Sequence, residues 1–390
     1  MMPRAFTSNI NTPMNNSLQT IAALVGIFTL SISLPAAAFD SGSDGSDGPL
    51  HIVLGYGEYL NFDPDHPQFH NADTPPEGLD ADRDGIYHFT TITIEQGAAL
   101  FLGGDVMGHK PVIWLASGDV TIDGRLSVSA GSPSGTYPST ATIPGAGGFA
   151  GGQPDGIIDG QGPGGSQAGS GQGPSDDYVN SYLIPLIGGS GAGLDTGNIY
   201  AASSGGGALL LASSSQIVIN GEIDAYGSDG ANGNGNVRLI ANEISGSGVL
   251  RGINILRMEA YQHSFNGTIN LYNEPGKTVR TRPGNVFQES PIKITIIEGN
   301  NGPYAVSDLN PGANKDAPDV TINEGGSVTI QVECTNIPLG TTIRVVGWND
   351  TVGQVEAVTG GLTGTLAASE ATCVMVIPTG NTTFMAQALP

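Results

Sequence analysis

The sequence predicts an all-β protein: a right-handed parallel β-helix (β-solenoid) that carries a glycine-rich insertion, followed by a small C-terminal β-sandwich. Two segments predict the solenoid. They share an apolar run, a Leu-Ala-Ser step, an alternating strand, an Asx-Gly corner and a closing glycine. The two segments are residues 208–227 (ALLLASSSQIVINGEIDAYG) and residues 112–131 (VIWLASGDVTIDGRLSVSAG). Similar corners recur along the chain, and short strands separated by turns fill its C-terminal part, as in a sandwich.

Corner glycines set the repeat length of the predicted solenoid. A glycine after Asp or Asn supplies the positive φ that a sharp corner needs. The five corner glycines are separated by 27, 97, 25 and 21 residues. Three of these intervals fall near one solenoid turn of roughly 20–30 residues, so the long interval predicts one turn plus a large insertion. The corners are at Gly97, Gly124, Gly221, Gly246 and Gly267.

The strand pattern predicts which side chains fill the solenoid. A single coil of short strands cannot bury its apolar residues, whereas stacked coils share a continuous core and backbone hydrogen bonds. Alternation places Val120, Ile122, Leu126 and Val128 on one face. Antiparallel hairpins are the alternative, because Asn-Gly and Asp-Gly also favour hairpin turns. The shared Leu-Ala-Ser segment and the recurring interval favour the solenoid.

The first 38 residues have the features of a signal peptide. Residues 21–34 are apolar and uncharged, follow Arg4, and are too short to span a bilayer comfortably. Ala36 and Ala38 fit a signal-peptidase site. We therefore expect cleavage between Ala38 and Phe39 and an exported chain with no further membrane insertion. An uncleaved anchor is the alternative.

Composition divides the rest of the chain into three parts. Residues 39–87 form an acidic N-terminal cap or lead-in, which begins as a polar and flexible segment. Residues 88–285 carry the solenoid, with the insertion at 131–207; the insertion is so rich in glycine that we expect no packed element within it. Residues 286–390 alternate short strands with turns, which is typical of an immunoglobulin-like sandwich.

The two cysteines, Cys334 and Cys373, both lie in this C-terminal part. An even pair in an exported chain predicts a disulfide. The bond would close a loop of about 40 residues and stabilise the fold by at most roughly 4 kcal/mol. We expect Trp348, within the strand TTIRVVGW, to lie in the sandwich core.

The charge balance restricts the partners. The chain has 13 Lys and Arg residues against 36 Asp and Glu residues, which gives a formal net charge of −23. Such a surface repels nucleic acid and anionic lipid, because phosphate binding needs Lys and Arg. The sequence therefore predicts no nucleic-acid partner and leaves a polysaccharide or another surface ligand as the candidate.

One acidic turn is a candidate calcium site. Asp80, Asp82 and Asp84 alternate and precede Gly85, as at the start of an oxygen-ligand calcium loop. The twelfth position of that loop is Thr91, so the bidentate carboxylate is missing. The alternative is an acidic turn that leads into the first coil. Calcium is the only cofactor that the sequence suggests.

The carboxylates of the coils raise the possibility of an enzyme that acts on polysaccharides. A hydrolase needs a carboxylate pair, and a lyase needs basic residues with calcium. Glu222 and Asp224 could share one surface, and Asp119 and Asp123 also lie in coils. Basic residues there are few, and corner carboxylates are usually only solvated. We assign no catalytic residue. The coil residues Lys110, Arg125, Arg238, Arg251 and Arg257 are the basic ones.

The run SGGGALLLASSSQIVINGEIDAYGSDGANG (204–233) resembles the glycine-rich parallel β-helix segments of bacterial surface and secreted proteins, including adhesin-like passenger domains. The insertion's GAGGFAGG (145–152) resembles their glycine-rich loops. The resemblance covers roughly residues 85–285. It implies a cell-surface or matrix location and a structural or adhesive, non-enzymatic role. The alternatives are a polysaccharide-active β-helix lyase or hydrolase and a calcium-dependent carbohydrate binder.

Overall fold

The structure is a computed structural model in which residues 1–37 form one unit and residues 38–390 another. The first unit, with most of the predicted signal peptide, lies outside the described residues. The structure describes residues 38–70, 78–80, 85–108, 110–131, 143–153, 158–170, 173–176, 178–179, 181–195, 202–228, 233–271, 277–286, 292–299, 302–305, 325–335, 337–349, 352–380 and 382–389.

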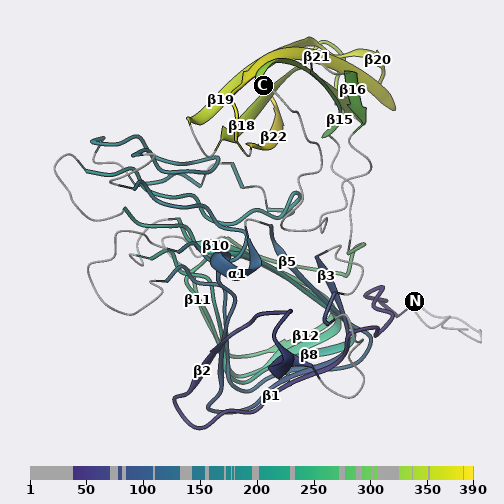
Figure 1. The fold of residues 1–390 in the computed structure, drawn as a ribbon. Helices are drawn as coiled ribbons and strands as arrows, with labels where there is room; N and C mark the ends of the chain where they lie inside the picture. Colours follow the sequence, from purple (N-terminus) through teal and green to yellow (C-terminus); the bar gives the residue numbers. More distant parts are fainter. Residues whose placement is uncertain are drawn as a thin grey trace, which may run out of the picture. The chain divides into compact units, whose positions relative to one another are not determined.

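Two parallel sheets run through the described part of the region from Gly48 to Thr281 (Figure 1). In each sheet, strands from successive coils are neighbours and run parallel. The antiparallel hairpin alternative is therefore wrong, and the pairing is compatible with the predicted solenoid. The eight-stranded sheet contains β1 (Gly48–Ile52), β3 (Ile86–Ile94), β5 (Val112–Ala116), β6 (Val120–Ile122), β8 (Ala208–Ile219), β10 (Gly235–Gly246), β12 (Ile253–Phe265) and β14 (Thr278–Thr281). The six-stranded sheet contains β2 (Tyr59–Asn61), β4 (Ala99–Phe101), β7 (Arg125–Ser127), β9 (Glu222–Asp224), β11 (Val249–Arg251) and β13 (Thr268–Asn270).

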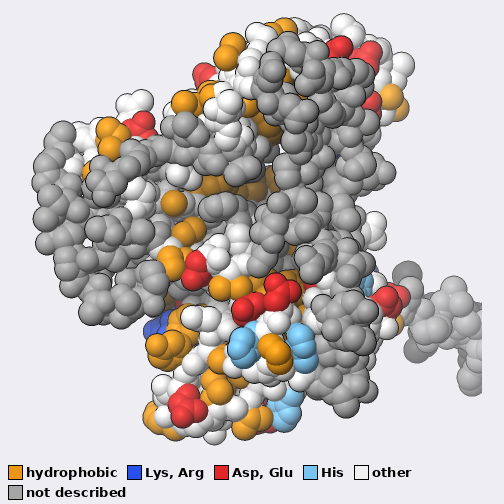
Figure 2. Space-filling model, in the orientation of Figure 1, with side chains coloured by type: hydrophobic (Ala, Val, Ile, Leu, Met, Phe, Trp, Pro, Cys, Tyr) orange, Lys and Arg blue, Asp and Glu red, His pale blue; other side chains and the backbone are white. Residues whose placement is uncertain are grey.

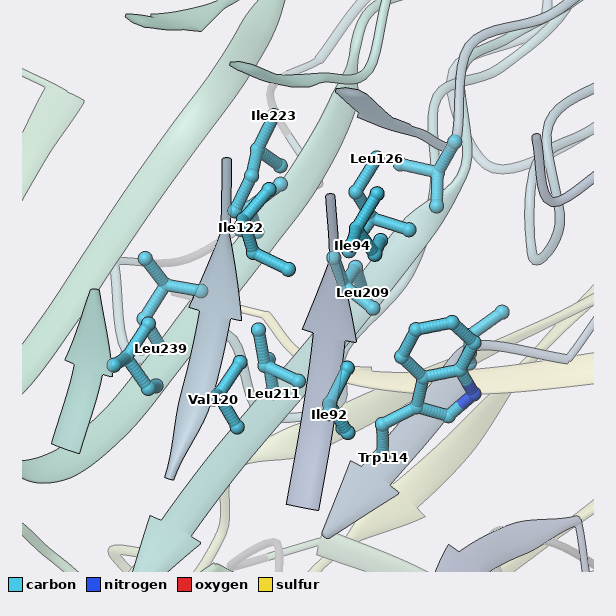
Figure 3. Packing of buried hydrophobic residues seen from close by; sticks show 14 of the residues in the cluster. Ile92, Ile94, Trp114, Val120, Ile122, Leu126, Leu209, Leu211, Ile223 and Leu239 are labelled. Carbon is cyan, nitrogen blue, oxygen red and sulfur yellow. The ribbon is translucent and has the colours of Figure 1, made fainter. Parts of the chain in front are cut away.

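A single apolar core lies between these two sheets. Val120, Ile122, Leu126 and Val128 are fully buried in it, as the alternation predicts. Ile122 lies beside Ile223, and Trp114 packs close to Ile92 (Figure 3). Each coil adds a few branched side chains to this stack, so each coil depends on its neighbours for burial.

The register across the insertion supports the predicted interval. Val120 pairs with Ile217, and Leu126 pairs with Ile223. Residues on either side of residues 131–207 therefore occupy adjacent coils, and the chain resumes the same strand positions after the insertion.

The corner glycines have a different physical role from the expected one. Only Gly97 and Gly246 have a positive φ, of 90° and 115°. Gly124 and Gly221 instead lie in a column where backbones of adjacent coils approach closely: a Cβ on Gly221 would lie 1.8 Å from the Gly124 carbonyl oxygen. In the next coil this place is taken by Gly248 and not by Gly246, because a Cβ on Gly248 would lie 2.2 Å from the Gly221 oxygen. Glycine is required in this column because it lacks a side chain.

The glycine-rich insertion is packed, so the expectation of no packed element is wrong. Its backbones hydrogen-bond to one another: Phe149 N donates to Gly189 O at 3.0 Å, and Gly191 N donates to Gln161 O at 2.9 Å. A Cβ on Gly191 would lie 2.0 Å from the Ala150 carbonyl oxygen. Because glycine lets the backbones come this close, backbone hydrogen bonds replace a side-chain core. We call residues 145–152, 160–166, 188–194 and 202–207 the glycine sheaf.

Residues 39–47 form a strap across the outer face of the eight-stranded sheet. Phe39 contacts β10 through Asn242, Ser41 contacts β8 and β5 through Ser214 and the Ala116 carbonyl, and Ser43 donates to the Phe89 carbonyl of β3 at 2.8 Å. We call this segment the N-terminal strap. The expected polar and flexible lead-in is thus a hydrogen-bonded segment that crosses four neighbouring strands before β1 begins.

The C-terminal part forms two antiparallel sheets around one apolar core (Figure 1). Val332 of one sheet and Val345 of the other are both fully buried there. Trp348 is also buried, but it does not belong to this core: Ile343 and Val345 point into it, and alternation turns Trp348 to the opposite face of its strand, so the expected core position is wrong. The five-stranded sheet contains β15 (Ile292–Gly299), β16 (Gly302–Ala305), β17 (Gly326–Cys334), β20 (Thr363–Thr365) and β21 (Ala368–Ile377); the three-stranded sheet contains β18 (Thr342–Asn349), β19 (Gly353–Gly361) and β22 (Thr382–Ala388).

The predicted Cys334–Cys373 disulfide is wrong, because both cysteines are free and buried. They lie on the adjacent antiparallel strands β17 and β21, but the register pairs Cys373 with Ile330 and Cys334 with Ser369. Four residues along a strand span about 13 Å, whereas a disulfide needs Cα atoms within about 7 Å. The even number of cysteines predicts a disulfide bond, but the strand register keeps the two residues too far apart to form it.

Candidate binding surface on the six-stranded sheet

The outward side chains of the six-stranded sheet form two rows. The middle residue of each strand points into the core, and the residues on either side of it point outward, as strand alternation requires. The rows cross the coils in register. The first row is Tyr59, Ala99, Arg125, Glu222, Val249 and Thr268, and the second row is Asn61, Phe101, Ser127, Asp224, Arg251 and Asn270. We call these twelve residues the outer rows.

Four charged side chains occupy the centre of the outer rows. Arg125 Nε donates to Asp224 Oδ2 at 2.5 Å and lies 3.1 Å from Glu222 Oε1. Arg251 Nη2 donates to the same Glu222 oxygen at 2.6 Å. The two arginines therefore bracket the two carboxylates, and the four charges sum to zero.

The Asp224 carboxylate is buried, and both of its oxygens accept hydrogen bonds from neighbouring side chains. Its side chain has 0 % exposure, and it also accepts hydrogen bonds from Ser127 Oγ at 2.6 Å and from Ser129 Oγ. Burial acts to raise the pKa of Asp224, but the Arg125 hydrogen bond and charge hold that pKa below its ordinary value. Asp224 is thus an ionised anchor that positions Arg125 and the two serines.

Glu222 differs from Asp224 although the two residues share one strand face. Its side chain is 21 % exposed. Burial raises the pKa of Glu222 above its ordinary value, and the neighbouring Asp224 carboxylate raises it further, while Arg251 acts against the rise. Glu222 is therefore the carboxyl group of the pair that both reaches solvent and holds a proton more readily.

Aromatic rings extend this charged centre in both directions. The Tyr59 and Phe101 rings meet edge to face with centroids 5.9 Å apart, and the Arg125 guanidinium lies 5.1 Å from the Phe101 centroid. On the other side, the Arg251 guanidinium lies 5.8 Å from the Tyr226 centroid. Each guanidinium is thus held by a carboxylate and by a ring, which fixes its position.

The outer face of the eight-stranded sheet, in contrast, is partly covered by the chain itself. The N-terminal strap crosses it, and Phe39 joins an apolar cluster there with Leu210, Ile240 and Val286. Arg238 is 3 % exposed and donates to the Val286 carbonyl at 2.8 Å. Arg257 and Arg238 both donate to Glu259 Oε1. These basic residues, singled out by sequence, therefore hold the covering segments in place.

The remaining sequence candidates lie apart from this surface. Asp119 accepts a hydrogen bond from Gln216, and Asp123 accepts one from Asn220, each across adjacent coils. Asp80 accepts from Gly85 N at 3.0 Å and donates its own N–H to Asp47. Asp82 and Asp84 lie outside the described residues.

Among the described residues, no three His, Cys, Asp or Glu side chains gather closely enough to hold a metal ion. In the same part of the chain, no helix has the length and apolar character that a bilayer crossing requires. Of the three predicted calcium ligands, Asp80 is therefore the one that lies in the described chain.

Sequence reasoning identified Glu222 and Asp224 but missed Arg125, Ser127 and Ser129 as their partners. Ser127 and Asp224 are 97 residues apart. The aligned corners at Gly124 and Gly221 could have revealed them, because equal offsets from these glycines place Ser127 beside Asp224. Searches against protein-family models, curated proteins and solved structures found no match to this chain.

Proposed function

We propose that this chain is an exported, non-enzymatic protein with an adhesive or structural role at a bacterial cell surface or in an extracellular matrix. In this proposal the parallel region is a right-handed β-solenoid that serves as a rod. The C-terminal sheets are an immunoglobulin-like sandwich that serves as a docking module. The observation that carries the proposal is the contrast between the two outer faces: one is partly covered by the chain, and the other presents most of the outer rows to solvent, with Ser127 and Asp224 buried beneath their neighbours.

The start of the described chain supports export. Ala38 is exposed, while Phe39 is buried and held by Asn242. Cleavage between these two residues would leave the N-terminal strap intact and remove only what precedes it. N-terminal sequencing of the secreted protein tests this step, and we expect Phe39 as the first residue.

The environment of Asp224 favours a non-enzymatic role. Glycoside hydrolysis needs two carboxyl groups that flank the scissile bond. Asp224 is fully buried and is occupied by Arg125, Ser127 and Ser129, so it cannot contact a sugar without rearrangement. Its role is to hold the surface together.

A polysaccharide hydrolase is the second candidate, and one observation favours it. The pKa of Glu222 is raised while that of Asp224 is lowered, and a divergence of this kind separates an acid from a base in many active sites. In this candidate, Glu222 would act as the acid.

One experiment separates these functions. The full chain is expressed in a bacterial host, recovered after export, and mixed with neutral and acidic polysaccharides. Size-exclusion chromatography with light scattering then follows the mass of both components. We expect co-elution at unchanged polysaccharide mass. A fall in polysaccharide mass would establish the enzyme instead, and the absence of both effects would remove the adhesive role towards polysaccharides.

A further inference from the structure

We propose that a neutral polysaccharide binds across the outer rows, from the Tyr59–Phe101 pair over Arg125 and Glu222 to the Arg251–Tyr226 pair. This inference rests on the adhesive function proposed above, and it adds a location and a class of ligand.

The chemistry of the outer rows suits sugar rings. Tyr59 is 70 % exposed, and aromatic faces of this kind pack against the C–H faces of sugars while their edges stay in contact with water. Arg251 and Arg125 have 38 % and 35 % of their side chains exposed. Their remaining N–H groups can donate to hydroxyl groups, and the exposed part of Glu222 can accept from them.

The surface is ordered before any ligand binds. Arg125 is held by Asp224 and by the Phe101 ring, and Arg251 is held by Glu222 and by the Tyr226 ring. Little side-chain entropy is left to lose on binding, which favours affinity from a modest number of contacts.

The length of the rows suits a chain and not a single sugar. From Tyr59 on β2 to Arg251 on β11 the proposed path crosses four strand spacings, which at about 4.8 Å each corresponds to roughly 19 Å. A ligand that contacts both aromatic ends must therefore be an extended polymer or a long oligosaccharide.

Charge selects a neutral polymer over an anionic one. The two arginines of the rows are balanced by Glu222 and Asp224, while the whole chain carries a formal charge of −23. Among the described side chains on the face shown in Figure 2, Asp and Glu appear in several places, whereas Lys and Arg appear in one small area. Such a protein repels uronate and phosphate polymers at long range, and it has no excess of positive charge to offset this at the surface.

The test compares variants on and off the surface. Tyr59→Ala removes an exposed ring, and Arg251→Gln removes a bracketing charge; Tyr261→Ala, an exposed tyrosine of the eight-stranded sheet, is the matched control. Affinity electrophoresis in gels with a soluble mixed-linkage β-glucan measures binding, and a gel with polygalacturonate tests the charge argument. We expect the exported wild-type protein to be retarded by the glucan alone. We also expect each of the two surface variants to bind at least about tenfold more weakly, with Tyr261→Ala unchanged.

The other outcomes separate this inference from the proposed function. Equal glucan binding by wild type and both surface variants would place the site elsewhere and leave the adhesive function standing. Binding of polygalacturonate in preference to glucan would overturn the ligand class. If the wild type binds neither polymer, this inference fails, and the adhesive function is then decided by the wider polysaccharide panel. Because Tyr59 is exposed, Tyr59→Ala is expected to fold even if Arg251→Gln does not.

Discussion

Asn242 holds the backbone of Phe39 with both ends of its side-chain amide. Phe39 N donates to Asn242 Oδ1 at 2.8 Å, and Asn242 Nδ2 donates to the Phe39 carbonyl at 3.2 Å. The same Nδ2 donates to the Ser214 carbonyl at 2.6 Å. The two residues are 203 positions apart. One side chain of β10 thus imitates a strand partner for the first residue of the N-terminal strap and links it to β8.

Replacing Asn242 should release the beginning of the strap. Asn242→Ala removes three partly buried hydrogen bonds and leaves their backbone partners unsatisfied, so we expect the free energy of unfolding to fall by about 1–3 kcal/mol. Urea unfolding measures this loss, and limited proteolysis should cleave the strap sooner. Asn220→Ala, which removes a bond to Asp123 in an exposed position, is the control. Equal stability of the two variants would show that the strap adds nothing to the fold.

The buried cluster around Glu259 should make the fold sensitive to acid. Glu259 is 1 % exposed and accepts from Arg238 Nε, Arg257 Nε and Gly284 N. Glu259→Gln leaves two guanidinium groups without their anion, and breaking a buried ion pair in this way costs about 3–5 kcal/mol. We expect a corresponding loss in urea unfolding at neutral pH. Glu243→Gln, which changes a carboxylate in an exposed hydrogen-bonded group, should stay close to wild type.

The pH dependence follows from the same group. Burial acts to raise the pKa of Glu259, but the hydrogen bonds and charges of Arg238 and Arg257 hold that pKa below its ordinary value of 4.5. The stabilisation is therefore complete above the unfolded pKa and is lost as the pH falls through the lower folded pKa. Wild-type stability should decline in acid more steeply than that of Glu259→Gln. Parallel stability curves below about pH 5 would exclude Glu259 as the cause.

The parallel strand pairing was predictable because its signal is local and repeated. Alternation identified Val120, Ile122, Leu126 and Val128 as buried, and the interval between Gly124 and Gly221 located the insertion. The outer rows follow from the same alternation once the coils are aligned. What the alternation could not show is which outer face stays open, because that depends on where the N-terminal strap and residues 282–286 run.

Other features depended on distances that sequence patterns do not contain. The Asx-Gly pattern predicts corners with a positive φ at Gly124 and Gly221, whereas neither has one and both lie where the backbones of adjacent strands approach closely. The insertion looked unstructured because composition measures apolar side chains, and its segments are joined by backbone hydrogen bonds instead. Cys334 and Cys373 do share an inward face, but a four-residue offset in register separates them.

The free cysteines give a chemical prediction. Burial raises the pKa of both the Cys334 and Cys373 thiols, so little thiolate is present at neutral pH. We expect a thiol reagent to leave the native protein unmodified and to label both cysteines in denaturant without any reductant. Reductant should leave the melting temperature unchanged. If the purified protein is two hydrogens lighter than the reduced chain and shows no free thiol in denaturant, the disulfide forms after all.

Adding even one methyl group within the glycine sheaf should destabilise the protein. A Cβ on Gly191 would lie 2.0 Å from the Ala150 carbonyl oxygen and 2.4 Å from its carbon, and neither backbone atom can move without disturbing its own hydrogen bonds. We expect Gly191→Ala to lower the free energy of unfolding by about 1–3 kcal/mol or more, since overpacking forces the backbones apart. Gly131→Ala is the matched control, because no heavy atom lies within 4 Å of its Cβ position and its φ is not positive. There we expect no loss and a gain of up to about 1 kcal/mol from reduced freedom of the unfolded chain. Hydrogen exchange of Gly191→Ala should be faster within the glycine sheaf than in the wild type. If exchange there is unchanged and the two variants are equally stable, the sheaf is not packed in solution.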